Sequence, residues 1–135
     1  MRRNKFWMEV EIKTSLLFPS GSAQIASSAT ATLSKVAVIL NRYPNPIHVE
    51  GFTDNKPIRT LAFPSNWELS AARAVTVTKY LVDQGAKPGN LSAAGYGEFD
   101  PVSDNNTEPG KQLNRRIEIV LQPNVSELPQ LPDSK

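Results

Sequence analysis

The sequence predicts an α+β domain, a two-layer sandwich in which two helices cover one face of a mixed four-stranded sheet. Short stretches of alternating apolar and polar residues indicate strands, and two longer stretches with apolar residues at helical spacing indicate helices. These elements follow one another in the order β-α-β-α-β-β, and right-handed crossovers between parallel strands place both helices on the same face. At 135 residues, the chain suffices for one domain with a single core.

The domain opens with a strand and a loop. Apolar and charged side chains alternate in residues 8–13, which is typical of a strand with one buried face. Residues 16–23 are first apolar and then small and flexible around Pro19 and Gly21, so we expect a loop with exposed backbone amides.

A helix and a second strand follow. Within residues 27–41, the apolar positions Leu33, Val36, Ala37 and Leu40 have helical spacing, and the Pro-rich residues 43–46 end the helix. Residues 47–52 alternate again and predict the second strand. Gly51 in this strand is expected to allow close packing of another backbone segment.

The second helix has clear end signals. Ser65 and Glu68 match a capping box, and Gly85 suits the position after the last turn. We expect the buried stripe of this helix to comprise Trp67, Ala71, Ala74, Val75, Thr78, Leu81 and Val82. Arg73 is expected on a neighbouring face with Asn66, Leu69 and Ser70.

The remaining elements are a weaker third strand at residues 91–96, a polar loop at 97–113, and a last strand. In this last strand Ile117, Ile119 and Leu121 alternate with other residues, after the sequence Asn114-Arg115-Arg116. We assign residues 1–7 to an N-terminal linker and 8–122 to the domain. Residues 123–135 contain three prolines and few apolar residues, which predicts a disordered tail.

Composition excludes several classes of function. The net charge of +2 is too small to indicate a nucleic-acid partner, and the absence of cysteine excludes disulfides and thiolate chemistry. No apolar run approaches a membrane helix, and the N-terminus lacks the apolar core of a signal peptide. We expect a soluble chain that is either cytoplasmic or a domain whose targeting segment lay before Met1.

One carboxylate and one guanidinium are expected at the same edge of the sheet. The second strand ends in Thr53-Asp54, a ten-residue loop follows, and the next helix carries Arg73 on its second turn. The pair Asp54 and Arg73 has two possible roles. It forms a structural salt bridge, or it binds a ligand that carries both an ammonium and a carboxylate group.

Three ordered motifs resemble the OmpA-like peptidoglycan-binding domain. They are Gly51-Phe52-Thr53-Asp54, then Asn66-x-x-Leu69-Ser70-x-x-Arg73-Ala74, then Asn114-Arg115-Arg116 before a strand. The resemblance covers about residues 10–121. It implies the OmpA-C-like fold and non-covalent binding of the peptidoglycan stem peptide through Asp54 and Arg73.

The ligand implied by this resemblance is the zwitterionic end of a diaminopimelate side chain. Asp54 is expected to accept hydrogen bonds from its ammonium group, and Arg73 to hold its carboxylate in a bidentate fork. Thr53, Asn66, Asn114 and Arg116 are further candidate contacts. Structural roles are the alternative for Thr53 and Asn66, and a solvated strand flank is the alternative for Arg116. No cofactor or metal is expected.

Within that family, the chain is similar to the MotB and MotD type of flagellar stator subunit. The loop of residues 56–65, the sequence Ser65-Asn66-Trp67-Glu68-Leu69-Ser70 and residues 17–23 carry this similarity. It implies a periplasmic, homodimeric wall anchor that is tethered to the inner membrane and works with an A-type stator subunit through an N-terminal membrane helix absent from this chain. Residues before Val10 are expected to couple wall binding to channel opening. A wall-anchoring module of an outer-membrane protein or lipoprotein, with no motor role, is the alternative.

Enzymatic activity is not expected. A serine triad would have to use His48, which lies on a strand away from the proposed site, and no His or Cys cluster exists to bind zinc. The acidic residues Glu98, Asp100 and Asp104 would form a glycosidase pair only by coincidence. We expect His48 to be exposed, and Trp67 to pack in the core or a dimer rather than to stack on sugar.

Overall fold

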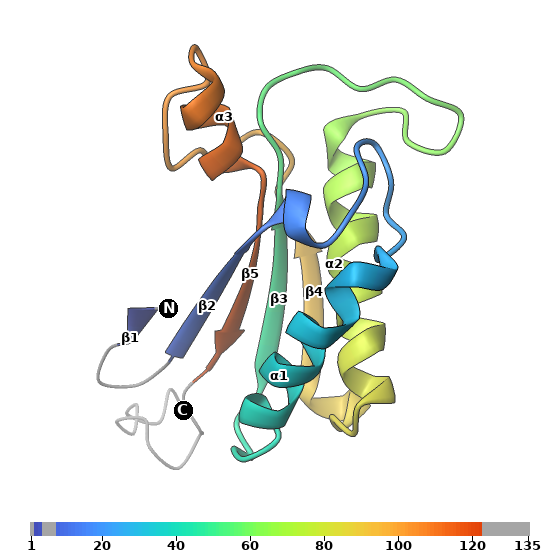
Figure 1. The fold of residues 1–135 in the computed structure, drawn as a ribbon, viewed down its shortest axis with the longest axis vertical. Helices are drawn as coiled ribbons and strands as arrows, with labels where there is room; N and C mark the ends of the chain where they lie inside the picture. The colour runs from blue at the N-terminus through green and yellow to red at the C-terminus, as the bar shows by residue number, and fades with distance from the viewer. Residues whose placement is uncertain (1, 4–7, 123–135) are drawn as a thin grey trace, which may run out of the picture.

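A computed structural model of the chain describes residues 2–3 and 8–122 (Figure 1). One sheet has the strand order β1-β2-β5-β3-β4, with β3 and β4 parallel and all other neighbours antiparallel. The strands are β1 (Arg2–Arg3), β2 (Met8–Lys13), β3 (Ile47–Phe52), β4 (Leu91–Gly95) and β5 (Arg116–Leu121). The predicted mixed four-stranded sheet is confirmed, and the two-residue β1 adds a fifth strand inside the segment assigned to the linker.

The helices α1 (Thr30–Leu40) and α2 (Asn66–Asp83) cover one face of the sheet, as predicted (Figure 1). Short 3-10 turns at Thr14–Leu16, Ser27–Ala29 and Pro88–Asn90 lead into or out of these elements. No helix in the described part of the chain combines the length and apolar character that a membrane crossing requires.

The core fills the space between the sheet and the two helices. The strands contribute residues such as Ile12, Val49 and Ile119, and the helices contribute residues such as Leu33 and Val77. Ile117, Ile119 and Leu121 of β5 belong to this core, as their predicted alternation implies, whereas Arg116 and Glu118 between them are also buried but lie outside it.

α2 begins and ends where the sequence signals placed its ends. The hydroxyl of Ser65 accepts a hydrogen bond from the backbone N–H of Trp67 at 3.2 Å and donates one to the Glu68 carboxylate. At the other end Gly85 has φ +109°, a conformation that favours glycine. These ends fix the length of α2 independently of which side it buries.

The predicted buried stripe of α2 is wrong in its first half. Trp67 and Val75 are 49% and 43% exposed. The buried side chains are instead Asn66, Leu69, Ser70, Arg73, Ala74, Val77 and Leu81. Polar side chains take buried positions here because they bond to adjacent loops. Ser70 Oγ, for example, accepts a hydrogen bond from the backbone N–H of Gly97 at 2.9 Å.

Two glycines bring α2 unusually close to the sheet. Gly51 of β3 and Gly95 of β4 lie side by side in the parallel register. A Cβ at Gly51 would overlap the carbonyl oxygen of Ser70, and one at Gly95 would overlap the amide nitrogen of Ala71. The close packing expected at Gly51 is therefore confirmed, and it holds the first turns of α2 against the ends of both strands.

A third helix, α3 (Glu108–Asn114), lies beyond the end of the sheet (Figure 1). The sequence predicted a polar loop over these residues, so that prediction is wrong. Thr107 caps the helix by accepting a hydrogen bond from the Gly110 N–H at 3.2 Å. The predicted tail at 123–135, and linker residues 1 and 4–7 with their expected coupling role, lie outside the described residues.

Candidate functional site

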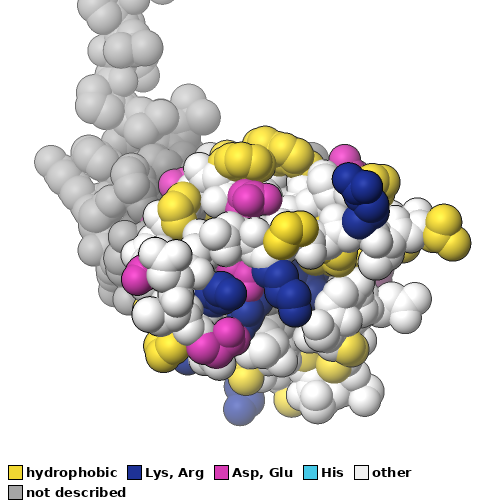
Figure 2. Space-filling view, turned by 90° about the horizontal axis from the view of Figure 1, so that it is seen from above, with side chains coloured by type: hydrophobic (Ala, Val, Ile, Leu, Met, Phe, Trp, Pro, Cys, Tyr) yellow, Lys and Arg dark blue, Asp and Glu magenta, His cyan; other side chains and the backbone are white. Residues whose placement is uncertain are grey.

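A pocket of about 470 Å³ lies at the edge of the sheet where β3 ends and α2 begins. It is lined by Thr14, Ser15, Phe18, Ser20, Gly21, Thr53, Asp54, Lys56, Pro57, Ile58, Asn66, Leu69, Arg73, Glu108 and Arg115. Figure 2 looks onto this end of the molecule and shows basic and acidic side chains gathered around a hollow. The expected carboxylate and guanidinium thus line one pocket.

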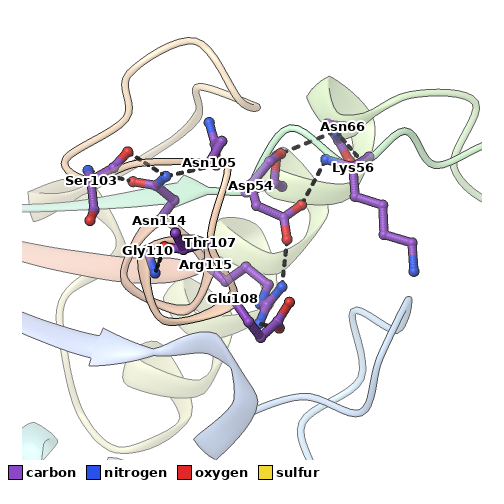
Figure 3. Close-up of polar contacts among 11 residues, drawn as sticks. Asp54, Lys56, Asn66, Ser103, Asn105, Thr107, Glu108, Gly110, Asn114 and Arg115 are labelled. Atoms are coloured by element: carbon purple, nitrogen blue, oxygen red, sulfur yellow. Dashed lines mark hydrogen bonds and ion pairs between the residues drawn. The ribbon is translucent and has the colours of Figure 1, made fainter.

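Asp54 is held by its neighbours on one wall of this pocket. The residue is buried, with only 5% of its surface exposed. Oδ1 accepts a hydrogen bond from the Lys56 backbone N–H at 3.0 Å, and Oδ2 pairs with Arg115 Nη1 at 2.5 Å (Figure 3). Arg115 also donates from Nη2 to Glu108 Oε1 at 2.9 Å. The result is a charged chain, Asp54–Arg115–Glu108, along the wall.

Arg73 is held separately by the first loop. Its Nε donates to the carbonyl oxygen of Ser22 at 2.8 Å, and Nη2 donates to that of Pro19 at 3.4 Å. The guanidinium also lies over the Phe18 ring, 5.2 Å from its centroid. Within the described ranges Nη1 has no hydrogen-bond partner, yet this atom is not enclosed by protein. Arg73 lines the pocket, and Nη1 is the nitrogen of its guanidinium that no described residue bonds.

The electrostatic environment of Arg73 reflects this position. Burial, and then the charge of Arg115, lower the pKa of Arg73 to about 10, while Asp54 opposes the shift. The structural salt bridge considered from the sequence is not formed, because Asp54 pairs with Arg115 instead. Glu108 and Asp54 raise the pKa of Arg115 against the effect of its burial. The guanidinium groups of Arg73 and Arg115 therefore both remain charged near neutral pH.

The lining carries more positive than negative charge. Lys56, Arg73 and Arg115 are cationic, and Asp54 and Glu108 are carboxylates, which leaves one net positive charge. A pocket with this balance favours a ligand that offers more carboxylate than ammonium groups. The first loop adds hydrogen-bond donors, because the amide groups of Ser20 and Gly21 have no acceptor in the described structure.

Thr53 and Asn66 also line the pocket, and their hydrogen bonds position Asp54. Thr53 Oγ1 donates to the carbonyl oxygen of Asp54 at 2.7 Å. Asn66 Nδ2 donates to the carbonyl oxygen of Lys56 at 3.1 Å and to Glu98 Oε1 at 3.2 Å. These hydrogen bonds agree with the structural roles considered for Thr53 and Asn66. Both residues nevertheless remain part of the pocket lining.

Asn114 and Arg116 do not line the pocket, contrary to their expected role as ligand contacts. Asn114 is fully buried, accepts hydrogen bonds from the amides of Val102 and Ser103, and is turned toward Asn105 (Figure 3). Its side chain holds the loop before α3 in place.

Arg116 points to the sheet face opposite the helices. Its Nε donates to Glu118 Oε2 at 2.6 Å, and the guanidinium stacks on Phe52 at 3.7 Å from the ring centroid. Burial, and then the neighbouring carboxyl group of Glu9, raise the pKa of Glu118 to about 7, while Arg116 acts in the opposite direction. Arg116 thus stabilises the back of the sheet rather than the pocket.

Arg115, Lys56, Glu108 and Thr14 are pocket residues that the sequence analysis did not select. For Arg115 the signal was present. Side chains along a strand point alternately to its two faces. Ile117 faces the helices, so Arg115, two residues before it, is expected on the helix side and Arg116 on the opposite side. Thr14 likewise comes two residues after the buried Ile12 of β2, at the start of a 3-10 turn. Lys56 and Glu108 lie on a loop and on α3, where no periodic pattern indicates direction.

Thr14 has a buried hydroxyl without a partner. Its Oγ1 is the one enclosed side-chain nitrogen or oxygen in residues 8–122 that forms no hydrogen bond. A buried hydroxyl in this state costs about 1 to 3 kcal/mol. We expect Thr14→Val, which keeps the shape, to raise the free energy of unfolding by about 1 kcal/mol in urea denaturation.

A matched variant separates this effect from a general effect of the substitution. Thr53→Val removes a buried hydroxyl that does donate a hydrogen bond, at 2.7 Å to the Asp54 carbonyl. It should lower the free energy of unfolding by about 1 kcal/mol. A loss of stability in Thr14→Val would show that its hydroxyl has a partner, such as an ordered water molecule.

His48 and Trp67 lie outside the pocket lining. His48 is partly buried rather than exposed, because Nδ1 bonds to Ser92 Oγ at 2.6 Å and Nε2 lies 3.2 Å from Glu50 Oε2. Trp67 packs on Phe99 at the surface instead of in the core.

Residues 2–3 and 8–122 contain no group of three or more His, Cys, Asp or Glu side chains placed to hold a metal ion.

Residues 17–115, which include most of the pocket, match the family described as the OmpA family. The chain belongs to the OmpA family. It is 40% identical over 121 residues to the uncharacterized protein YtxE of Bacillus subtilis, covering 89% of this chain and 50% of that protein. It is 36% identical over 116 residues to motility protein B of the same organism, covering 84% and 44% respectively. The chain thus spans about half the length of these relatives.

Solved structures show the same fold. The cell wall anchor of the T6SS from Pseudomonas aeruginosa has a TM-score of 0.85 at 34% identity, covering 88% of this chain and 83% of that one. The periplasmic domain of Helicobacter pylori MotB has a TM-score of 0.84 at 29% identity, covering 93% and 82%. The OmpA-C-like architecture expected from the sequence is therefore confirmed, as is the similarity to MotB periplasmic domains.

Proposed function

We propose that this domain binds peptidoglycan without a covalent bond, by taking the zwitterionic end of a diaminopimelate side chain between Asp54 and Arg73. One observation carries the proposal. The two opposite charges line the same pocket, but each is held by its own protein contacts rather than by the other. A ligand with both charges can therefore bind between them without breaking an Asp54–Arg73 pair.

Each side chain keeps capacity for a ligand. The oxygens of Asp54 each accept one hydrogen bond, and a carboxylate offers about four acceptor positions. Arg73 presents Nη1, and the amides of Ser20 and Gly21 offer further donors to a carboxylate. The net positive lining suits a stem peptide that carries additional carboxylate groups.

The affinity of one such site is modest. Each charged hydrogen bond contributes about 1.5 to 3 kcal/mol net. Peptidoglycan presents many copies of the same side chain on one polymer, so several domains held together attach far more tightly than one. Such binding is reversible at each site and durable for the assembly, as an anchor requires.

We further propose that the anchored assembly is a flagellar stator. Similarity to motility protein B and to the periplasmic domain of MotB supports this assignment. In this proposal the domain is periplasmic and homodimeric, a membrane helix before this segment tethers it to the inner membrane, and an A-type subunit completes the stator. The domain holds the stator still while the rotor turns, and it has no catalytic role.

Similarity to a T6SS cell wall anchor favours a second candidate, wall anchoring without a motor role. The pocket serves either assembly equally, since both need only a fixed attachment to the wall. In this proposal, the nature of a membrane-anchoring segment before Met1 distinguishes them. A membrane helix with an acidic residue indicates a stator, and a lipidated cysteine or an outer-membrane domain indicates the other class.

The ligand can be tested by co-sedimentation with two kinds of purified sacculi. Diaminopimelate-type sacculi should pellet the domain. Sacculi with lysine at that peptide position should pellet at least tenfold less, because lysine lacks the side-chain carboxylate that Arg73 would bind. Equal pelleting with both would overturn the proposal, since the zwitterion would then not be recognised.

A further inference from the structure

Two aromatic rings are stacked on the surface beside the pocket. The Trp67 and Phe99 ring centroids lie 5.0 Å apart with an interplanar angle of 21°. Trp67 is 49% exposed and Phe99 is 63% exposed. With ~150–250 Å² for each side chain, the pair leaves on the order of 200 Å² uncovered. Two exposed rings held together in this way offer a flat apolar surface to a ligand.

The protein holds this ring pair in a fixed position. Gly97 has φ +61°, and a Cβ added there would lie 3.5 Å from the Phe99 ring and 3.6 Å from the Trp67 ring, so the backbone of Gly97 packs close to both rings. The Gly97 N–H donates to Ser70 Oγ at 2.9 Å. Its carbonyl oxygen accepts from the Thr53 N–H at 2.8 Å. The turn that carries Phe99 is therefore bonded directly to a residue of the pocket wall.

Phe99 stands between two acidic residues in the sequence, Glu98 and Asp100. Glu98 Oε1 accepts a hydrogen bond from Asn66, but Oε2 has no partner in residues 8–122. The Asp100 carboxylate likewise forms no hydrogen bond with the described residues, and Asp100 is exposed. An apolar ring face next to free carboxylate acceptors suits a ligand with one C–H face and several O–H or N–H donors at its edge. A sugar ring has this chemistry.

We propose that the stacked pair of Trp67 and Phe99 binds a sugar ring of the peptidoglycan glycan strand, while the pocket holds the stem peptide of that strand. This proposal rests on the proposed function. The C–H face of an N-acetylhexosamine packs on the exposed surface of this ring pair. Its hydroxyl or acetamido N–H groups donate to the carboxylates of Glu98 and Asp100.

The position of the ring pair supports this occupant. Asn66 lines the pocket and Trp67 is the next residue, about 3.8 Å away along the backbone. β3 and β4 are parallel and end at one edge of the sheet, so Asp54 after β3 and Phe99 after β4 lie at the same end of the molecule. Sugar and stem peptide are covalently joined, and one ligand can therefore occupy both places.

The size of the exposed surface argues against a second copy of the chain as occupant. A stable protein interface buries about 800 Å² on each partner. The ring pair offers only about a quarter of that area. The flanking carboxylates would also need cationic partners in a protein interface, whereas neutral sugar donors satisfy them without added charge.

The test compares three ligands by isothermal titration calorimetry: a diaminopimelate-containing stem peptide, the same peptide on its disaccharide, and the disaccharide alone. The unmodified domain should bind the disaccharide-peptide about fivefold tighter than the peptide. The Phe99→Ala variant should bind the peptide and the disaccharide-peptide equally well. Both affinities should match the affinity of the unmodified domain for the peptide alone. Tyr43→Ala, which removes a 41% exposed ring at the opposite end, should behave as the unmodified domain.

The possible outcomes distinguish this inference from the proposed function. If the disaccharide adds no affinity, or if Phe99→Ala keeps the full gain, the sugar site is wrong although peptide binding stands. If the disaccharide alone binds and Phe99→Ala abolishes this, the sugar site is supported even where the peptide fails to bind. If Phe99→Ala instead lowers the mass of the ligand-free protein in analytical ultracentrifugation without affecting ligands, the rings contact a second copy and the proposal is overturned.

Discussion

Replacing Arg73 by lysine is expected to leave the fold intact and to weaken binding to diaminopimelate-type sacculi by at least tenfold. Lysine keeps the positive charge but presents one compact ammonium group, which cannot reproduce the geometry in which Nε and Nη2 bond to the loop carbonyls while Nη1 is left for a ligand carboxylate. Loss of one charged hydrogen bond, about 1.5 to 3 kcal/mol, corresponds to roughly 10-fold to 150-fold in affinity. Co-sedimentation over a range of sacculus concentrations measures this change.

Stability should follow a different course from affinity. The pKa of Arg73 is lowered to about 10, below its value in the unfolded chain, so the charged form is less favourable in the folded protein than in water. Lysine keeps this buried charge and its cost, but it loses the hydrogen-bond geometry of Arg73 to the loop carbonyls, so Arg73→Lys should leave the melting transition unchanged or lower it slightly. If Arg73→Lys binds diaminopimelate-type sacculi as strongly as the unmodified domain, the ligand does not need the planar guanidinium of Arg73.

A matched pair of variants completes the measurement. Arg42→Lys makes the same substitution at an exposed arginine of the opposite end, and it should affect neither binding nor melting. Asp54→Asn should weaken binding by a similar factor as Arg73→Lys, because a neutral amide loses the attraction to the ligand ammonium. It should also cost some stability, since Arg115 loses its buried partner and keeps only the exposed Glu108.

The positions of Asp54 and Arg73 were predictable because strong local signals fix them. A strand end sets Asp54, and a capped helix sets Arg73 a known number of residues later. Arg115 was missed although the alternation of β5 implies its direction. Two adjacent arginines at a strand start must point to opposite faces, and the buried parity of Ile117 assigns Arg115 to the helix side.

The parts of the fold that the sequence did not predict depend on tertiary contacts. α3 has seven residues and includes Pro109 and Gly110, so no helical periodicity is visible in it. Its Gly110 is needed because a Cβ would overlap the carbonyl oxygen of Asp104, a contact between segments that no local pattern encodes. The face that α2 buries was likewise misjudged, because its polar residues bond to loops that only the complete fold brings near.

Gly51→Ala is expected to destabilise the domain strongly. The new methyl group would overlap the Ser70 carbonyl oxygen, which is backbone and cannot rotate away. α2 would have to move off β3, and the adjacent contact of Gly95 with Ala71 would open as well. Overpacking of this kind costs about 3 kcal/mol, which urea denaturation can measure as a fall in the free energy of unfolding.

Gly89→Ala provides the comparison, because a Cβ at Gly89 meets no atom within 4 Å. It should change the free energy of unfolding by less than about 0.5 kcal/mol. Equal effects of the two substitutions would show that the close approach at Gly51 is not required.

Because α2 carries both Asn66 and Arg73, a helix displaced at Gly51 would also move Arg73 relative to Asp54. Any Gly51→Ala protein that still folds should therefore bind sacculi more weakly, although no pocket side chain has been changed.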